Sequence, residues 1–101
     1  MAFRFEWDPA KAALNLRKHG VSFDLALWVF ADPFALTGPS LVEVGELRWQ
    51  TIGAVDGQVL PLVAHTVREE DEDGQCVEVI CIISARLADR KERLRYEQET
   101  R

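Results

Sequence analysis

With 101 residues, the chain is long enough for one domain, which we expect to cover residues 1–101. Hydrophobic residues make up 48% and charged residues 29%, as in globular proteins, and no apolar run approaches the roughly 20 residues of a membrane-spanning helix. The net charge of −5 argues against nucleic-acid binding by the surface as a whole, because such binding relies on Lys and Arg. The first seven residues do not resemble a signal peptide, so we expect a cytoplasmic protein without membrane contact.

The first part of the chain predicts a strand and a helix. Aromatic and charged residues alternate over residues 3–7, which indicates a short, half-buried strand. Asp8 and Pro9 then begin a helix, because Asp is a good N-cap and Pro suits the first helical position. The helix is expected to run to about Lys18 and to end at Gly20.

A second helix is predicted over residues 23–30. Ser22 caps its start, and Asp32-Pro33 marks its end. Residues 33–45 contain further Gly and Pro, so we expect a loop there, with at most a short extended piece at about residues 41–44.

The remaining sequence predicts an antiparallel meander. One strand is expected over residues 47–55, and Asp56-Gly57 is a strong hairpin signal. The return strand, residues 58–68, contains Pro61, which favours a bulge or an unpaired edge there. After an acidic turn, the apolar run over residues 76–84 predicts a central strand covered on both faces.

A last helix is predicted from about Asp89, since Asp89 and Glu92 have the spacing of a capping box. The order of the elements is a strand, two helices, a meander and a helix. This order indicates an α+β domain.

Metal and cofactor chemistry have little support. Neither His19 nor His65 lies in a metal-binding pattern, and no glycine-rich phosphate loop is present, so we expect no metal and no cofactor. Cys76 and Cys81 would point to opposite faces of a strand, so they cannot easily pair, and we expect both to be small buried side chains. Ser84 has no activating base near it in the sequence.

Basic residues at strand ends carry the candidate chemistry. His65 and Arg68 close the return strand, Arg48 opens the strand before it, and Arg86 follows the central strand. If these strands are neighbours, the side chains converge on one patch of the sheet. Such a patch suits metal-independent RNA cleavage, in which the ribose 2′-hydroxyl attacks the adjacent phosphate, His transfers protons and Arg stabilises the developing charge.

Each of these residues also has a structural interpretation. A lone strand His is usually structural, and Arg68, beside the acidic residues 69–73, is placed to form surface ion pairs. Arg86 is placed to bond carbonyl groups at a strand-to-helix junction. Moreover, His65 and Arg68 point to opposite faces of an unbroken strand, so both act at one site only if a bulge intervenes.

Several strings, in order along the whole chain, resemble the BrnT family of toxins. The N-terminal strings are FEWDPAK (residues 5–11), Asn15, KHGVSF (18–23) and VFADP (29–33). The central ones are GE, RW and TIG within residues 45–53, and then HT (65–66) with Arg68. The C-terminal ones are IISAR (82–86), Ala88, Arg90, Glu92, Arg93 and Tyr96.

The resemblance implies a RelE-like fold, with an antiparallel sheet of about four strands, two N-terminal helices and a C-terminal helix. It implies an endoribonuclease toxin of a type II toxin–antitoxin system, which arrests growth by cutting RNA. The implied partner is a BrnA-like antitoxin, whose ribbon-helix-helix part binds operator DNA so that the complex represses its own operon. Two toxin and two antitoxin chains are expected in the complex.

The same resemblance assigns roles to residues. Arg68 and Arg86 would bind the phosphate and the transition state, and His65 would be the acid or base. Tyr96 would stack on a base. The expected substrate-binding residues are Lys18, His19, Arg48, Ser84, Arg90 and Tyr96.

The chain departs from the family pattern in two places. Cys81 stands where the family commonly has Arg, and residues 69–75 are unusually acidic. Both changes reduce positive charge beside the expected site, and RNA binding is electrostatic. The alternative interpretation is therefore a toxin homologue with weak or no catalysis, which binds its antitoxin in transcriptional autoregulation.

Overall fold

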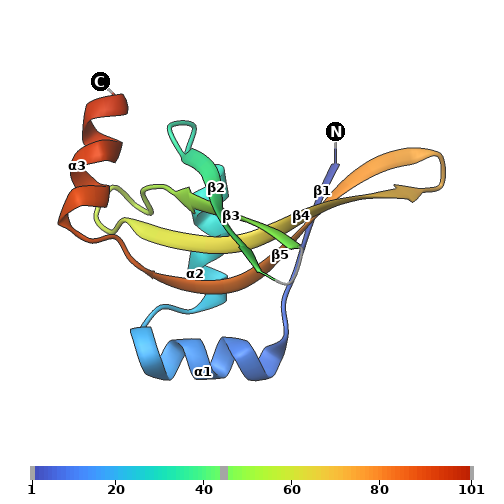
Figure 1. Cartoon of the computed structure of the whole chain (residues 1–101), viewed down its shortest axis with the longest axis horizontal. Coiled ribbons are helices and arrows are strands. Elements are labelled where there is room, and N and C mark those ends of the chain that lie inside the picture. Colours follow the sequence, from blue (N-terminus) through green and yellow to red (C-terminus); the bar gives the residue numbers. More distant parts are fainter. Residues whose placement is uncertain (1, 44–45, 101) are drawn as a thin grey trace.

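The structure is a computed structural model, and it describes residues 2–43 and 46–100 (Figure 1). The elements of the first half are β1 (Ala2–Glu6), α1 (Pro9–His19), α2 (Phe23–Leu27), the 3₁₀ helix η1 (Trp28–Ala31) and β2 (Leu36–Glu43). Those of the second half are β3 (Glu46–Ile52), β4 (Pro61–Glu72), β5 (Gln75–Leu87) and α3 (Arg90–Glu99). No helix in these ranges is long and apolar enough to cross a membrane.

The described strands form one mixed sheet in the order β1-β5-β4-β3-β2. The four strands β2 to β5 are antiparallel neighbours, whereas β1 pairs in parallel with β5. The sheet was expected to contain about four strands, all antiparallel. The described sheet has five strands, and the pairing of β1 with β5 is parallel, so the antiparallel prediction was wrong for β1. The additional strand, β2, contains Gly38 and Pro39, which predicted a loop, but Pro is tolerated in a strand at the edge of a sheet. Of the extended piece expected near residues 41–44, Val44 lies outside the described residues.

The two faces of the sheet are covered differently (Figure 1). α1, α2 and η1 cover one face, here called the helix face, whose core includes Phe23, Val29 and Val63. α3 covers only one end of the other face, where Tyr96 packs on Ile52 and other apolar residues. No helix of the described residues covers the rest of that second face, and we call it the open face.

The helix starts were correctly predicted. The side chain of Asp8 accepts a hydrogen bond from the amide of Ala10, and Gly20 ends α1. The second helix is shorter than expected, because the α-helical turns that Ser22 caps continue from Trp28 as a 3₁₀ helix. At the start of α3, Asp89 and Glu92 form the expected capping box.

The turns explain where the strands differ from expectation. Asp56-Gly57 does form a turn with positive φ at both residues, but it belongs to a loop between β3 and β4. Pro61 is the first residue of β4, a position that tolerates proline, and it forms no bulge. β4 and β5 instead continue to a two-residue turn at Asp73-Gly74, so the acidic run is mostly strand.

A β-bulge in β5 determines which side chains reach the open face. Ala64 of β4 pairs with Ser84, but its neighbour His65 pairs with Ile82, so Ile83 is an extra residue in β5. Without the bulge, Ser84 and Arg86 would share the face of Ile82, which is 1% exposed in the helix-face core. With it, both residues point to the open face.

Asn15 of α1 holds the strand beyond the bulge. Its side-chain amide donates to the carbonyl of Ala85 (2.8 Å), and its Oδ1 accepts from the amide of Ala85 (3.1 Å). It also donates to the carbonyl of Val21 (3.0 Å). Because Ala85 is thereby fixed on the helix face, its two neighbours in β5 must face the other way.

Candidate active site

The strand registers place four of the expected residues on the open face. Arg68 lies three residues after His65 in β4, and His65 is on the helix face, so Arg68 points to the open face. Ser84 and Arg86 point to the open face because they follow the bulge in β5. Trp49 pairs with His65 on the helix face, so its neighbour Arg48 belongs to the open face.

Arg68 lies in a network of carboxylates. Its guanidinium donates to Glu6 of β1 (2.6 Å) and to Glu70 of its own strand (3.1 Å). Arg4 of β1 in turn pairs with Glu70 (2.6 Å) and with Glu72. The hydrogen bonds that Arg68 donates to Glu6 and Glu70 raise the pKa of Arg68 and lower the pKa of both carboxyl groups. These groups are therefore ionised near neutral pH.

Arg86 forms a bidentate ion pair with Glu92 of α3. Its Nη1 donates to Oε1 (2.8 Å) and its Nη2 to Oε2 (2.9 Å). Glu92 also accepts a hydrogen bond from the amide of Asp89 in the capping box (2.8 Å). The same glutamate therefore helps to start α3 and orients Arg86. The hydrogen bonds of this pair lower the pKa of Glu92 and raise that of Arg86.

His65 lies on the helix face, away from these arginines. It is 2% exposed, its Nε2 is hydrogen-bonded to the hydroxyl of Thr51 (2.8 Å), and Thr51 is bonded to Thr37 (2.8 Å). The rings of His65 and Phe30 pack in a T-shaped arrangement, with 5.1 Å between their centroids. Burial lowers the pKa of His65, so it is neutral near pH 7. β4 is unbroken between His65 and Arg68, and the structure does not bring the two together.

The other expected residues lie around the open face or beyond it. Lys18 and His19 are exposed at the end of α1, on the opposite side of the sheet (Figure 1). Arg90 is exposed at the start of α3. Tyr96 is half-buried, and its hydroxyl donates to Asp32. Burial, together with this bond, raises the pKa of Tyr96 to about 12.

Cys81 lies on the open face, opposite Thr66 of β4 and Glu6 of β1. It is half-buried, whereas Cys76, near the tip of the hairpin, is exposed, so the expectation that both are buried was wrong for Cys76. Position 81, where the family resemblance led us to expect Arg, is therefore on the same surface as Arg68.

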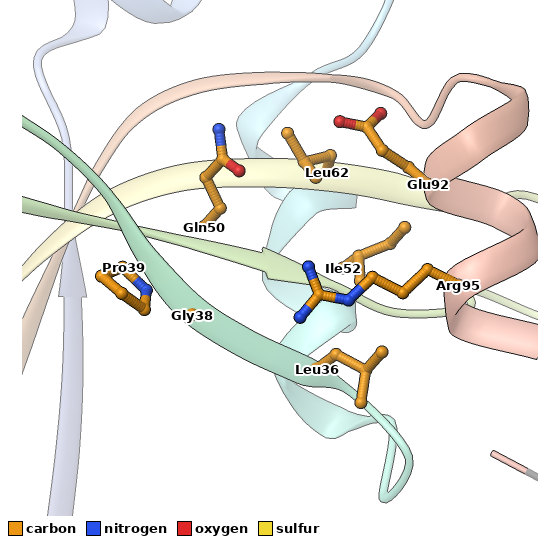
Figure 2. Close-up of a pocket in the computed structure, with 8 residues that line it drawn as sticks. All are labelled: Leu36, Gly38, Pro39, Gln50, Ile52, Leu62, Glu92 and Arg95. Carbon is orange, nitrogen blue, oxygen red and sulfur yellow. The ribbon is translucent and has the colours of Figure 1, made fainter. Parts of the chain in front are cut away.

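A groove of about 120 Å³ lies between α3 and the strands β2 and β3 (Figure 2). The Arg95 side chain extends from α3 over the sheet, toward Ile52 and Leu36. Glu92, which holds Arg86, is part of the wall. The main lining residues are Leu36, Gln50, Ile52, Leu62, Glu92 and Arg95.

No local sequence pattern predicts the carboxylates of the site or the groove. Glu6 and its partner Arg68 are 62 positions apart, and only the parallel pairing of β1 with β5 brings them together. Among residues 2–43 and 46–100, no group of three His, Cys, Asp or Glu is placed to hold a metal ion. The open face instead carries guanidinium groups that are paired with carboxylates, and a guanidinium is a group well suited to binding phosphate.

Comparison with known proteins identifies the family. A family profile described as the ribonuclease toxin BrnT of type II toxin–antitoxin systems matches residues 7–92. The chain belongs to the BrnT family. Its fold is similar to the 1.1 Å crystal structure of the Brucella abortus ribonuclease toxin BrnT, with a TM-score of 0.62 and 25% identity over 89% of this chain and 100% of the other. No curated protein sequence matches it.

Membership in the BrnT family indicates the substrate class and the kind of partner. The family consists of ribonuclease toxins, so RNA is the substrate class, and a type II system pairs the toxin with an antitoxin. The arginines of the open face are the chemistry in this BrnT chain that is best suited to RNA.

Proposed function

We propose that this BrnT-family chain is an endoribonuclease that cuts RNA on its open face without a metal ion. The observation that carries the proposal is the bulge at Ile83, which places Ser84 and Arg86 on the same face as Arg68. A regular strand would have pointed Arg86 into the helix-face core. A cation beside the substrate phosphate supplies the charge that cleavage requires.

In the proposed reaction, the ribose 2′-oxygen bonds to the adjacent phosphorus and the bond from phosphorus to the 5′-oxygen breaks. The 2′-hydroxyl proton passes to water, and the leaving 5′-oxygen takes a proton from water. The products are a 2′,3′-cyclic phosphate and a 5′-hydroxyl. Arg68 and Arg86 hold the phosphate and stabilise its added negative charge, because a guanidinium donates two parallel hydrogen bonds to phosphate oxygens.

The other expected residues receive roles that fit their positions. Arg48 and Ser84 flank the phosphate site on the open face and bind substrate. His65 is not assigned proton transfer, because a proton-transfer group must come within hydrogen-bond reach of the substrate and His65 lies on the helix face. Its role is to support the sheet through its hydrogen bond to Thr51. Lys18 and His19 contact only an RNA strand that extends around the edge of the sheet.

Cleavage of a single-stranded RNA in the presence of EDTA tests the proposal. We expect Arg68→Ala and Arg86→Ala each to lower kcat/KM by about 100-fold, as removal of one transition-state donor does. Lys11→Ala, which removes one positive charge from the exposed surface of α1, is the matched control and should cut normally. Full activity in both arginine variants, or intact RNA with folded wild-type protein, would refute the proposal.

For the remaining biology we propose what the family resemblance implies. The fold is RelE-like, the protein acts in the cytoplasm, and its antitoxin is BrnA-like. Two chains of each protein form the complex, which contacts operator DNA through the antitoxin alone. Mass measurement of the purified complex tests this composition.

A second candidate function has specific support from the open face. Arg4, Arg68 and Arg86 each form an ion pair with a carboxylate, and Cys81 supplies no positive charge. These features fit a catalytically silent homologue that binds its antitoxin and contributes to repression. Growth arrest on expression without antitoxin would exclude this alternative, and normal growth with soluble protein would favour it.

A further inference from the structure

The groove beside α3 has an apolar floor and polar walls. Leu36, Ile52 and Leu62 supply apolar surface, and Arg95 extends its guanidinium over it (Figure 2). A flat aromatic ring fits such a setting, because one ring face packs on aliphatic groups and the other stacks under a guanidinium.

Gln50 supplies a recognition group in the same groove. The residue is half-buried, and within the described part of the chain its side chain makes no hydrogen bond. An amide offers both a donor and an acceptor, and leaving it unpaired where water is partly excluded is unfavourable. A ligand edge that carries a donor next to an acceptor would pair with it.

The groove is connected to the phosphate site. Gln50 pairs with Ala64, and Ala64 pairs with Ser84, so two strand spacings, about 10 Å, separate Gln50 from Ser84. One nucleotide can span this distance. Glu92 belongs both to the groove and to the pair that orients Arg86.

We propose that this groove binds one unpaired nucleobase next to the scissile phosphate. The base lies between the apolar floor and the guanidinium of Arg95, and its Watson–Crick edge is read by the amide of Gln50. The inference rests on the proposed ribonuclease function. It makes single-stranded RNA the substrate class, since a base enters the groove only when its pairing edge is free.

The test uses a mixed-sequence single-stranded RNA that contains all sixteen dinucleotide steps, with cut sites mapped after partial digestion. We expect Gln50→Ala to weaken the base preference at the cut site by about tenfold. Arg95→Ala should raise KM by about tenfold while leaving the order of base preference unchanged, because stacking tolerates every base. Gln98→Ala and Arg93→Ala, two exposed α3 substitutions outside the groove, are the matched controls.

A binding measurement separates this inference from the proposed function. Oligonucleotides of the same sequences with 2′-deoxyribose cannot be cleaved, and their affinities are measured by fluorescence anisotropy. Base-dependent affinity that Gln50→Ala abolishes supports the groove even if the wild-type protein cuts nothing. Cutting and binding patterns that both variants leave unchanged overturn the groove proposal, even if the RNA is cleaved.

Discussion

At the scale of single residues, the open face holds its arginines in fixed orientations. Glu92 accepts hydrogen bonds from Arg86 with both carboxylate oxygens, and Glu6 and Glu70 form ion pairs with Arg68. Each carboxylate restrains its arginine, but it also competes with phosphate for the same donors. RNA must therefore displace or share these pairs, which are partly exposed and hence weak.

His65 makes stability depend on pH. Burial lowers its pKa below the ordinary 6.5, so between the two values the unfolded chain binds a proton that the folded chain does not. The free energy of unfolding should therefore decrease as the pH falls below about 6.5, by at most ~1.4 kcal/mol per pH unit from this residue.

Denaturant titrations at pH 7.5 and 5.5 measure this effect. His65→Gln retains a polar group for Thr51 and should show a smaller loss of stability between the two pH values than the wild type. His19→Gln, which changes an exposed histidine, should lose as much as the wild type. An equal loss in all three proteins would show that His65 does not carry the dependence.

At the scale of elements, three contacts fix α3 at the edge of the open face. The capping box of Asp89 and Glu92 begins the helix, Arg86 ties its first turn to β5, and Tyr96 ties its last turns to Asp32. Burial acts to raise the pKa of Asp32, but hydrogen bonds from Tyr96 and two backbone amides outweigh it and lower that pKa. Asp32 is thus a charged anchor between α3 and the loop after η1.

Tyr96→Phe should remove this anchor but keep the ring. We expect a loss of about 1 kcal/mol, seen as a decrease of roughly 5 °C in Tm by circular dichroism. If the ring stacks on a base, as the family resemblance implies, this variant still cuts RNA at the wild-type rate below its Tm, whereas Tyr96→Ala does not. An unchanged Tm would mean that the hydroxyl bond to Asp32 contributes nothing.

Sequence patterns predicted those elements whose signals are local. Asp8 and Gly20 delimit α1, and Asp89 starts α3, because caps act within a few residues of themselves. The bulge at Ile83 has no such signal, since Ile83 is one more apolar residue in an apolar run. Its position is set by β4 and by Asn15, both distant in sequence. The arginines were therefore predictable as candidates, but their common face was not.

The position of His65 was predictable only in part, for the same reason. Alternation along β4 correctly put His65 and Arg68 on opposite faces, but it could not tell which face was open. That depends on which side α1 and α2 cover. The 3₁₀ helix η1 supplies Phe30, which packs on the His65 ring and helps to bury it.

At the scale of the whole molecule, an acidic protein offers RNA the ion-paired arginines of one face. The net charge of −5 repels RNA at long range, and the projecting β4–β5 hairpin adds acidic groups to both faces. Local contact with guanidinium groups must overcome this repulsion. Long-range repulsion and local contact can be separated, because removing a negative charge far from the open face changes only the long-range repulsion.

Replacing both Glu6 and Glu70 by Gln should therefore strengthen RNA binding by more than the change in net charge alone would. The substitutions release Arg68 from both carboxylates and keep side chains of similar size. We expect about fivefold tighter binding of a non-cleavable oligonucleotide at low salt, the scale of exposed ion pairs. The gain should shrink as added salt screens the charges.

Asp24→Asn with Asp56→Asn is the matched control, because it also removes two negative charges at exposed positions, one in α2 and one in the turn after β3. Asn tolerates the positive φ of the turn residue Asp56, so the fold is kept. If this control tightens binding as much as the Gln pair does, long-range repulsion limits RNA binding, and the ion pairs on Arg68 do not. If only the Gln pair tightens it, the carboxylates of β1 and β4 restrain the site directly, and activity in this chain depends on how easily RNA exchanges with them.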